Sequence, residues 1–151
     1  MLNLSRATSG IAMRLFMSLL WISVSAGLII NDFNATHLLN QDWPPHARLH
    51  MMTLFTSTVA FTLFGLYLCW GPAQSRLEHV RLSAIAGSLY MYGLVLAALT
   101  MPYYGGSMEW TDTAPQSVSL DNENFVVFLC FAAIFTVLTI TTHLNLSDTR
   151  R

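Results

Sequence analysis

Lysine is absent from this sequence, and charged residues of all kinds make up only 10% of its 151 residues. Soluble domains carry about 25% charged residues, so the chain lacks the polar surface that a water-soluble globule requires. It also has no basic run or arginine-rich arm of the kind that binds nucleic acid. With 54% hydrophobic residues, the chain is predicted to be an integral membrane protein, and nucleic acid is not an expected partner.

Four apolar segments are long enough to cross a bilayer, because a helix needs about 20 residues to span about 30 Å of hydrocarbon. Their expected bounds are residues 11–30, 50–70, 82–101 and 125–142. Short connections favour an all-α, four-helix transmembrane bundle with up-down-up-down topology, which forms a single membrane domain over residues 1–151. The first segment could instead be a signal peptide, but its length and the central Trp21 favour a membrane anchor.

The placement of the arginines predicts the orientation of the helices. Six of the seven fall in the N-terminus, the 71–81 connection and the C-terminus, and Arg48 alone falls in the other two connections. Because basic residues stay on the cytoplasmic side, both termini are predicted to be cytoplasmic, and the chain is expected in a bacterial inner membrane. Cys69 then lies at the cytoplasmic end of its span and Cys130 in the outer half of its own, so no disulfide is expected.

Polar and small residues within the spans are expected to face the interior, because apolar burial gives helices little reason to associate in lipid. Each of the first three spans carries such residues at helical spacing. They are Ser18, Trp21, Ser25 and Asp32 in the first span, His46, His50, Thr53 and Ser57 in the second, and Ala86, Tyr90, Gly93, Ala97 and Thr100 in the third. Helix packing is the ordinary explanation of such stripes, but the second one ends in two histidines at the outer membrane surface.

Histidines and a carboxylate gather in the connection between the first two spans. Pro44-Pro45 fits the first turn of a helix, so His46 and His50 stand one turn apart on one face, as in helices that offer two imidazoles to one metal ion. Together with Asp32 and His37 they form a predicted metal site. This set of ligands suits iron, zinc or copper, with open positions for a substrate.

Four more residues are assigned to the same site. Glu123 and Tyr90 are candidate catalytic groups, and Thr53 and Ser57 are predicted to line the substrate path below the histidines. Two other interpretations remain for the histidines. They could belong to a polar catalytic or ligand site without a metal, or they could be solvated groups at the lipid headgroups that respond to pH.

The segment from Asp32 to His50 reads Asp32-x4-His37-x5-Trp43-Pro44-Pro45-His46-Ala47-Arg48-x-His50. This string resembles a signature of small, uncharacterised four-helix membrane proteins, a resemblance that brings no established activity. In architecture the chain also looks like the emopamil-binding and sigma-2 receptor group. Those are four-helix proteins with a lipid-facing cavity lined by acidic groups, and some isomerise sterols. The chain departs from that pattern because no carboxylate lies in the middle of its second span.

These features predict a metal-dependent membrane enzyme, of oxidoreductase, hydrolase or isomerase type, acting on a lipid-soluble small molecule at the outer membrane face. One alternative is a small accessory subunit of a larger membrane complex, such as a respiratory complex. A ligand-binding or transport bundle is a third interpretation, although no mid-membrane charge or inverted repeat marks a transport path. The expected partners are membrane lipids and a lipid-soluble substrate, together with further copies of the chain or a larger complex.

Overall fold

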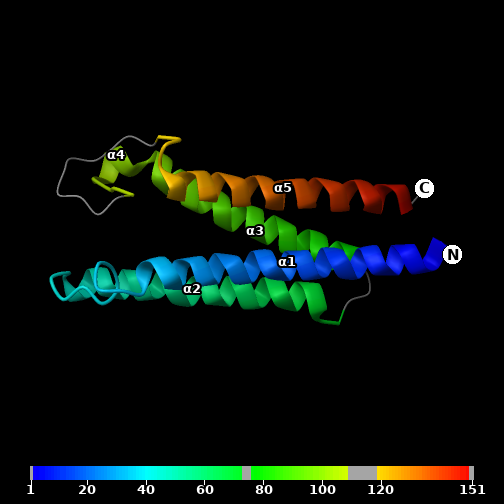
Figure 1. Cartoon of the computed structure of the whole chain (residues 1–151), viewed down its shortest axis with the longest axis horizontal. Helices are drawn as coiled ribbons and strands as arrows, with labels where there is room; N and C mark the ends of the chain where they lie inside the picture. Colours follow the sequence, from blue (N-terminus) through cyan, green and yellow to red (C-terminus); the bar gives the residue numbers. More distant parts are fainter. Residues whose placement is uncertain (1, 73–75, 109–118, 150–151) are drawn as a thin grey trace. The chain divides into compact units, whose positions relative to one another are not determined.

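Figure 1 shows the computed structural model, in which the described secondary structure is helical. The structure describes residues 2–72, 76–108 and 119–149. Its helices are α1 (Leu2–Asp32), α2 (Pro45–Trp70), α3 (Arg76–Leu99), the single turn α4 (Met101–Tyr104) and α5 (Glu123–Thr149). Four segments within these residues are long and apolar enough to cross a membrane: Gly10–Asp32, Pro45–Trp70, Arg76–Leu99 and Glu123–Asn145. The predicted all-α class with four candidate membrane spans is confirmed.

The helices extend past several of the predicted span ends. α2 begins at Pro45, five residues before the predicted span, and so confirms that the Pro44-Pro45 pair starts the helix, because a proline in the first turn lacks only an N–H that would have no helical partner. α3 begins at Arg76 rather than at residue 82, and α5 continues to Thr149 rather than ending at residue 142. Backbone hydrogen bonds carry a helix beyond the hydrocarbon edge, so hydropathy locates the span but not the helix ends.

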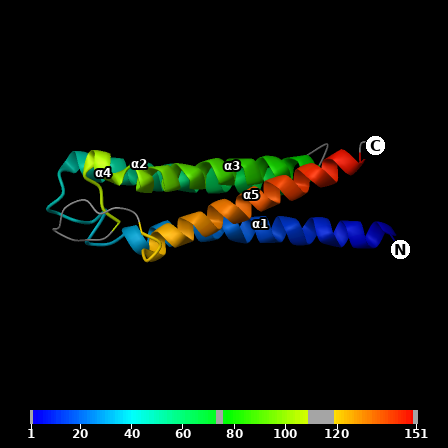
Figure 2. The same ribbon diagram turned by 90° about the horizontal axis from the view of Figure 1, so that it is seen from above.

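The chain divides into two compact units, residues 1–83 and 84–151. In the first unit α1 lies beside α2, and Figure 2 shows the loop that joins them at one end of the hairpin. The two helices run antiparallel, because successive positions along α1 contact earlier and earlier positions along α2. These contacts are Ser18 with Trp70, Trp21 with Gly65, and Ser25 with Thr62.

Trp21 is the centre of the first unit. Its side chain is 0% exposed and lies against Gly65, where a Cβ would overlap the indole ring. The indole Nε1 donates a hydrogen bond to Ser83 Oγ at 3.0 Å, and Ser83 Oγ donates to the Gly65 carbonyl at 3.0 Å. These contacts join α1, α2 and the first turns of α3, and they leave the indole N–H and the serine hydroxyl satisfied in an interior without water.

The second unit pairs the rest of α3 with α5. Phe135 is 0% exposed and occupies the space that Gly87 leaves, where a Cβ would overlap the phenyl ring. Towards the other end of this pair, Val95, Ala98 and Phe125 form a buried cluster. The two helices are therefore antiparallel, because the later residues of α3 contact the earlier residues of α5.

The predicted face of α1 is confirmed, because Ser18, Trp21 and Ser25 all contact α2. On α2 the structure differs from the prediction. The buried residues there are Phe55, Thr58, Thr62, Gly65, Leu68 and Cys69, not the stripe that contains the histidines. The exposed Thr53 needs no interior partner, because its hydroxyl donates to the Leu49 carbonyl one turn earlier at 2.9 Å.

The predicted packing stripe on α3 is wrong at Gly93. No described atom lies within 4 Å of the place where its Cβ would be, and Ala97 is exposed. α3 uses Gly87 instead, because Phe135 approaches the backbone there. Cys69 is a buried free thiol of the first unit, and Cys130 is an exposed free thiol of the second.

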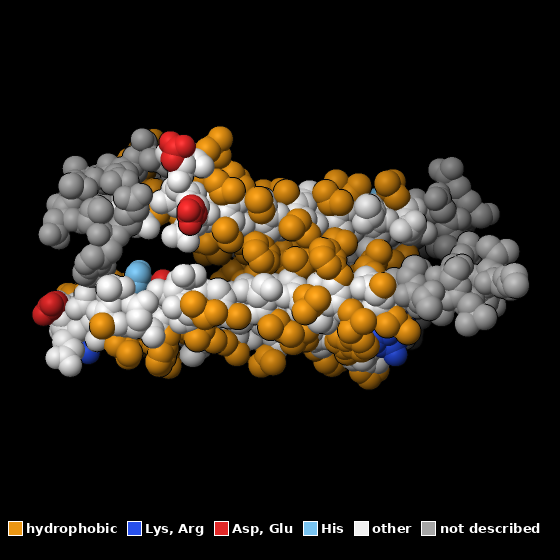
Figure 3. Space-filling model, viewed as in Figure 1, with side chains coloured by type: hydrophobic (Ala, Val, Ile, Leu, Met, Phe, Trp, Pro, Cys, Tyr) orange, Lys and Arg blue, Asp and Glu red, His pale blue; other side chains and the backbone are white. Residues whose placement is uncertain are grey.

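Figure 3 shows apolar side chains along the helices, whereas the coloured acidic and basic atoms on this face lie near the helix ends. This distribution suits a bilayer, in which charged groups avoid the hydrocarbon core. Ionisable side chains gather at the two ends of the α1–α2 hairpin.

Gly65→Ala is expected to destabilise the detergent-solubilised protein by about 1–3 kcal/mol, because the added Cβ forces Trp21 out of its position. Gly93→Ala is the matched control and is expected to leave stability unchanged or raise it by up to about 1 kcal/mol, since its Cβ meets open space and alanine favours the helix. Thermal unfolding followed by tryptophan fluorescence measures both. Equal losses in the two variants would contradict the packing of Trp21 against Gly65.

Candidate functional site

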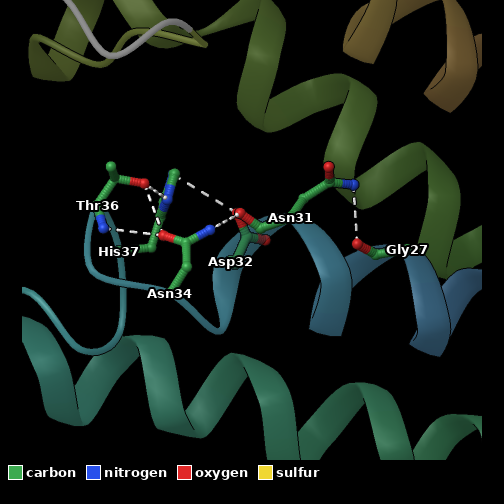
Figure 4. Close-up of polar contacts among 6 residues, drawn as sticks. All are labelled: Gly27, Asn31, Asp32, Asn34, Thr36 and His37. Carbon is green, nitrogen blue, oxygen red and sulfur yellow. Dashed lines mark hydrogen bonds and ion pairs between the residues drawn. The ribbon is translucent and has the colours of Figure 1, made fainter.

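The loop between α1 and α2 is organised by two asparagines. Asn31 Nδ2 donates to the Gly27 carbonyl at 2.8 Å, which holds the side chain against the last turn of α1. Asn34 Oδ1 accepts from the backbone N–H of Thr36 at 2.9 Å and from the Thr36 hydroxyl at 2.7 Å. Figure 4 shows how this turn, typical of asparagine, brings Thr36 and His37 back toward the end of α1.

His37 lies between a carboxylate and a hydroxyl. Its Nε2 is 3.5 Å from Asp32 Oδ1, and its Nδ1 is 2.9 Å from Thr36 Oγ1. The two side chains are only partly covered, with 32% of His37 and 23% of Asp32 exposed. The carboxylate beside one ring nitrogen and the hydroxyl on the other together orient the imidazole.

His46 and His50 form a second pair on the first turns of α2. Their Nε2 atoms are 2.9 Å apart, their ring centroids are 4.4 Å apart, and the ring planes are nearly perpendicular at 85°. Both side chains are exposed. The spacing confirms that the two imidazoles share one helix face, and the two Nε2 atoms point at each other.

The separation of these two nitrogens can be compared with metal coordination. Metal–imidazole bonds of about 2.0–2.1 Å that meet at about 90° place the two nitrogens about 2.9 Å apart, and a tetrahedral angle places them about 3.3 Å apart. The observed 2.9 Å between His46 and His50 is the length of the hydrogen bond between their Nε2 atoms. It equals the separation of adjacent ligands around a square-planar or octahedral ion, but the rings would have to turn both nitrogens toward a common point to bind one. A tetrahedral ion needs only a few tenths of an ångström of opening.

The predicted ligands are thus brought together as two pairs, Asp32 with His37 and His46 with His50. Among the residues that the structure describes, no group of three or more histidine, cysteine, aspartate or glutamate side chains is placed to hold one ion. A site in which all four residues share one metal stays a prediction. Pairs of this kind leave most coordination positions to water or substrate.

The other predicted site residues lie in several places. Thr53 is exposed one turn beyond His50, and Ser57 is half-buried one turn further on, so both continue the face that bears the histidine pair. Tyr90 is half-buried on α3 in the second unit. Glu123 is exposed at the first position of α5, next to Asn122, whose Oδ1 accepts from the Phe125 N–H at 3.1 Å.

Sequence reasoning did not assign Thr36 to this site. The structure places its hydroxyl against both His37 and Asn34. The signal was present in the string Asn34-Ala35-Thr36, because an asparagine side chain commonly bonds to the backbone two residues later in a turn.

The model of a family of unknown function (DUF6640) matches residues 16–136, a range that includes the whole of the loop and both residue pairs. No curated protein and no solved structure matches the chain. The match agrees with the expected membership of an uncharacterised family, whereas the likeness to the emopamil-binding group stays a prediction.

Proposed function

Because the chain belongs to this family of unknown function, its family supplies no activity, and we propose from its own residues that it is a metal-dependent integral membrane enzyme. The proposed substrate is a lipid-soluble small molecule. The observation that carries the proposal is the 2.9 Å separation of the exposed Nε2 atoms of His46 and His50. The two imidazoles lie at the start of a candidate membrane span. A metal ion bound there would be accessible to lipid-soluble molecules at the surface of the bilayer.

Each residue pair has its own proposed role. His46 and His50 would hold iron, zinc or copper, and a bound ion would supply a Lewis acid or an activated water or oxygen. His37, oriented by Asp32, is the general base. In the hydrogen bond between His46 and His50 one Nε2 donates and the other accepts. Metal binding would replace this bond, with both Nε2 atoms deprotonated and acting as ligands.

The substrate path and the remaining catalytic residues are also proposals. Thr53 and Ser57 extend the outward face of α2 from the histidine pair, so a lipid-soluble molecule would approach the ion along them. Thr53 already donates to the Leu49 carbonyl and keeps its oxygen as an acceptor. Glu123 and Tyr90 are the candidate catalytic groups of the second unit.

A metal titration tests the proposal on protein stripped with chelator and purified with an affinity tag that contains no histidine. The wild type is expected to bind one molar equivalent of copper, zinc or iron. His46→Ala and His50→Ala should each weaken binding by at least about tenfold, because each removes one of two ligands. Elemental analysis after gel filtration and calorimetric titration measure the loss.

Three matched variants sharpen this experiment. His79→Ala on α3 and His143→Ala on α5 should leave metal binding unchanged. His37→Ala should also keep the metal but should abolish any metal-dependent change in lipid extracts incubated with the protein, since it removes the proposed base. Full metal occupancy in the double variant His46→Ala/His50→Ala would end the proposal.

We also propose that both chain ends are cytoplasmic and that the α1–α2 loop lies on the outer side of a bacterial inner membrane, because six of seven arginines favour that orientation. In a variant with Cys69 and Cys130 replaced by alanine, Gln41→Cys in the loop should react with a membrane-impermeant maleimide added to intact cells. Pro72→Cys, exposed in the turn after α2, should react only after the membrane is opened. The reverse pattern would place the histidines in the cytoplasm.

An accessory role in a larger membrane complex is the second candidate, and the open face of α3 favours it. Gly93 and Ala97 leave a surface of small residues on which another helix could approach closely. Purification in mild detergent separates the two candidates. A stable monomer or small homo-oligomer is expected for the enzyme, and co-purification with a fixed set of larger subunits would support the accessory role instead.

A further inference from the structure

The end of the α1–α2 hairpin away from the loop carries a stacked arginine. The guanidinium carbon of Arg14 lies 3.9 Å from the centroid of the Trp70 ring. The Trp70 Nε1 in turn donates to Ser18 Oγ at 2.8 Å, and Ser18 Oγ donates to the Arg14 carbonyl at 2.8 Å. The Trp70 ring is thereby fixed against α1, and the Arg14 guanidinium lies over its face.

The position of Trp70 at the end of α2 indicates how deep in the membrane Arg14 and Trp70 lie. Trp70 is the last residue of α2 and of the candidate span Pro45–Trp70, and Arg14 lies against its ring. Both side chains therefore lie at the edge of the hydrocarbon, where tryptophan rings prefer to sit and where lipid phosphates are found.

A second arginine contacts the same tryptophan. Arg76 Nη1 donates to the Gly71 carbonyl at 2.9 Å and to the Trp70 carbonyl at 3.4 Å. It thus binds the negative end of the α2 helix while keeping its own positive charge. Two guanidinium groups consequently lie around Trp70, one on its ring and one on its backbone.

Neither charge is neutralised within the part of the chain that the structure describes. Arg14 and Arg76 form no ion pair there, and the Arg14 Nε is buried without a hydrogen-bond partner. Arg81 differs, because its Nη2 lies 3.4 Å from the carboxylate of Glu78. An uncompensated cation at the hydrocarbon edge is costly, so the surroundings are expected to provide an anion.

We propose that Arg14, Trp70 and Arg76 bind the phosphate of an anionic phospholipid at this end of the hairpin. The planar Arg14 guanidinium suits a phosphate that accepts two hydrogen bonds side by side. Arg76 adds a second positive charge, and the apolar flanks of α1 and α2 accommodate the acyl chains. Bound lipid holds the end of the hairpin that lies away from the histidines.

Native mass spectrometry of the full chain tests the site, with phosphatidylglycerol and phosphatidylcholine added in equal amounts. Wild-type protein is expected to retain phosphatidylglycerol preferentially. Arg14→Gln and Arg76→Gln should each reduce the bound fraction about fivefold, the effect of one basic residue near a membrane surface. Arg81→Gln is the charge-matched control at the same end and should change binding less than about twofold, because Glu78 already neutralises Arg81.

Two further measurements test whether the variants fold and whether the bound phosphate belongs to a lipid or to a soluble molecule. Arg14→Lys keeps the charge but loses the planar stack, and it should retain more phosphatidylglycerol than Arg14→Gln, with both variants eluting as folded protein in gel filtration. Millimolar glycerol 3-phosphate should not displace the lipid. Displacement would assign the site to a soluble phosphate and overturn the proposal, as would equal binding of the two lipids, or equal losses in the Arg14, Arg76 and Arg81 variants.

Discussion

The packing of Trp21 against Gly65 is the interaction on which the first unit depends. In a bilayer, apolar burial gives helices little reason to associate, and an unpaired N–H is costly. The absence of a side chain at Gly65 allows the indole to pack closely against the α2 backbone. Ser83 accepts a hydrogen bond from the indole N–H, which is therefore not left unpaired. Ser83 in turn donates its hydroxyl hydrogen to the Gly65 carbonyl. The Ser83 hydroxyl therefore links α1, α2 and the start of α3 through hydrogen bonds in an apolar interior.

The two ends of the hairpin, on either side of this contact, carry different ionisable groups. At the loop end, α2 starts at Pro45 and presents His46 and His50 outward, away from the buried face. At the other end, Trp70 closes α2 and carries the stacked Arg14. The proposed chemistry at one end and the proposed lipid binding at the other are both compatible with the buried residues that the structure describes, which include hydroxyls but no charged side chain, because ionisable groups are least costly at the membrane edge.

Periodicity and composition predicted the four spans, the proline start of α2 and the histidine spacing, because each depends on local sequence. Which faces of α2 and α3 are buried could not be predicted in the same way. Thr53 and Thr62 look alike in the sequence, but Thr53 bonds its own helix whereas Thr62 also contacts α1. Gly87 and Gly93 are both glycines of α3, but Phe135 packs against Gly87 and no described atom packs against Gly93. This difference depends on tertiary packing, which local sequence does not reveal. The pairing within the loop likewise depends on a turn rather than on spacing.

The proposed metal site is tested most directly by X-ray absorption spectroscopy of protein loaded with one molar equivalent of copper or zinc. The geometry of the histidine pair predicts two imidazole ligands, with oxygen donors in the remaining positions. The imidazole scattering should disappear in His46→Ala/His50→Ala. A spectrum with no imidazole contribution, or one that the double variant leaves unchanged, would contradict a metal site built on His46 and His50.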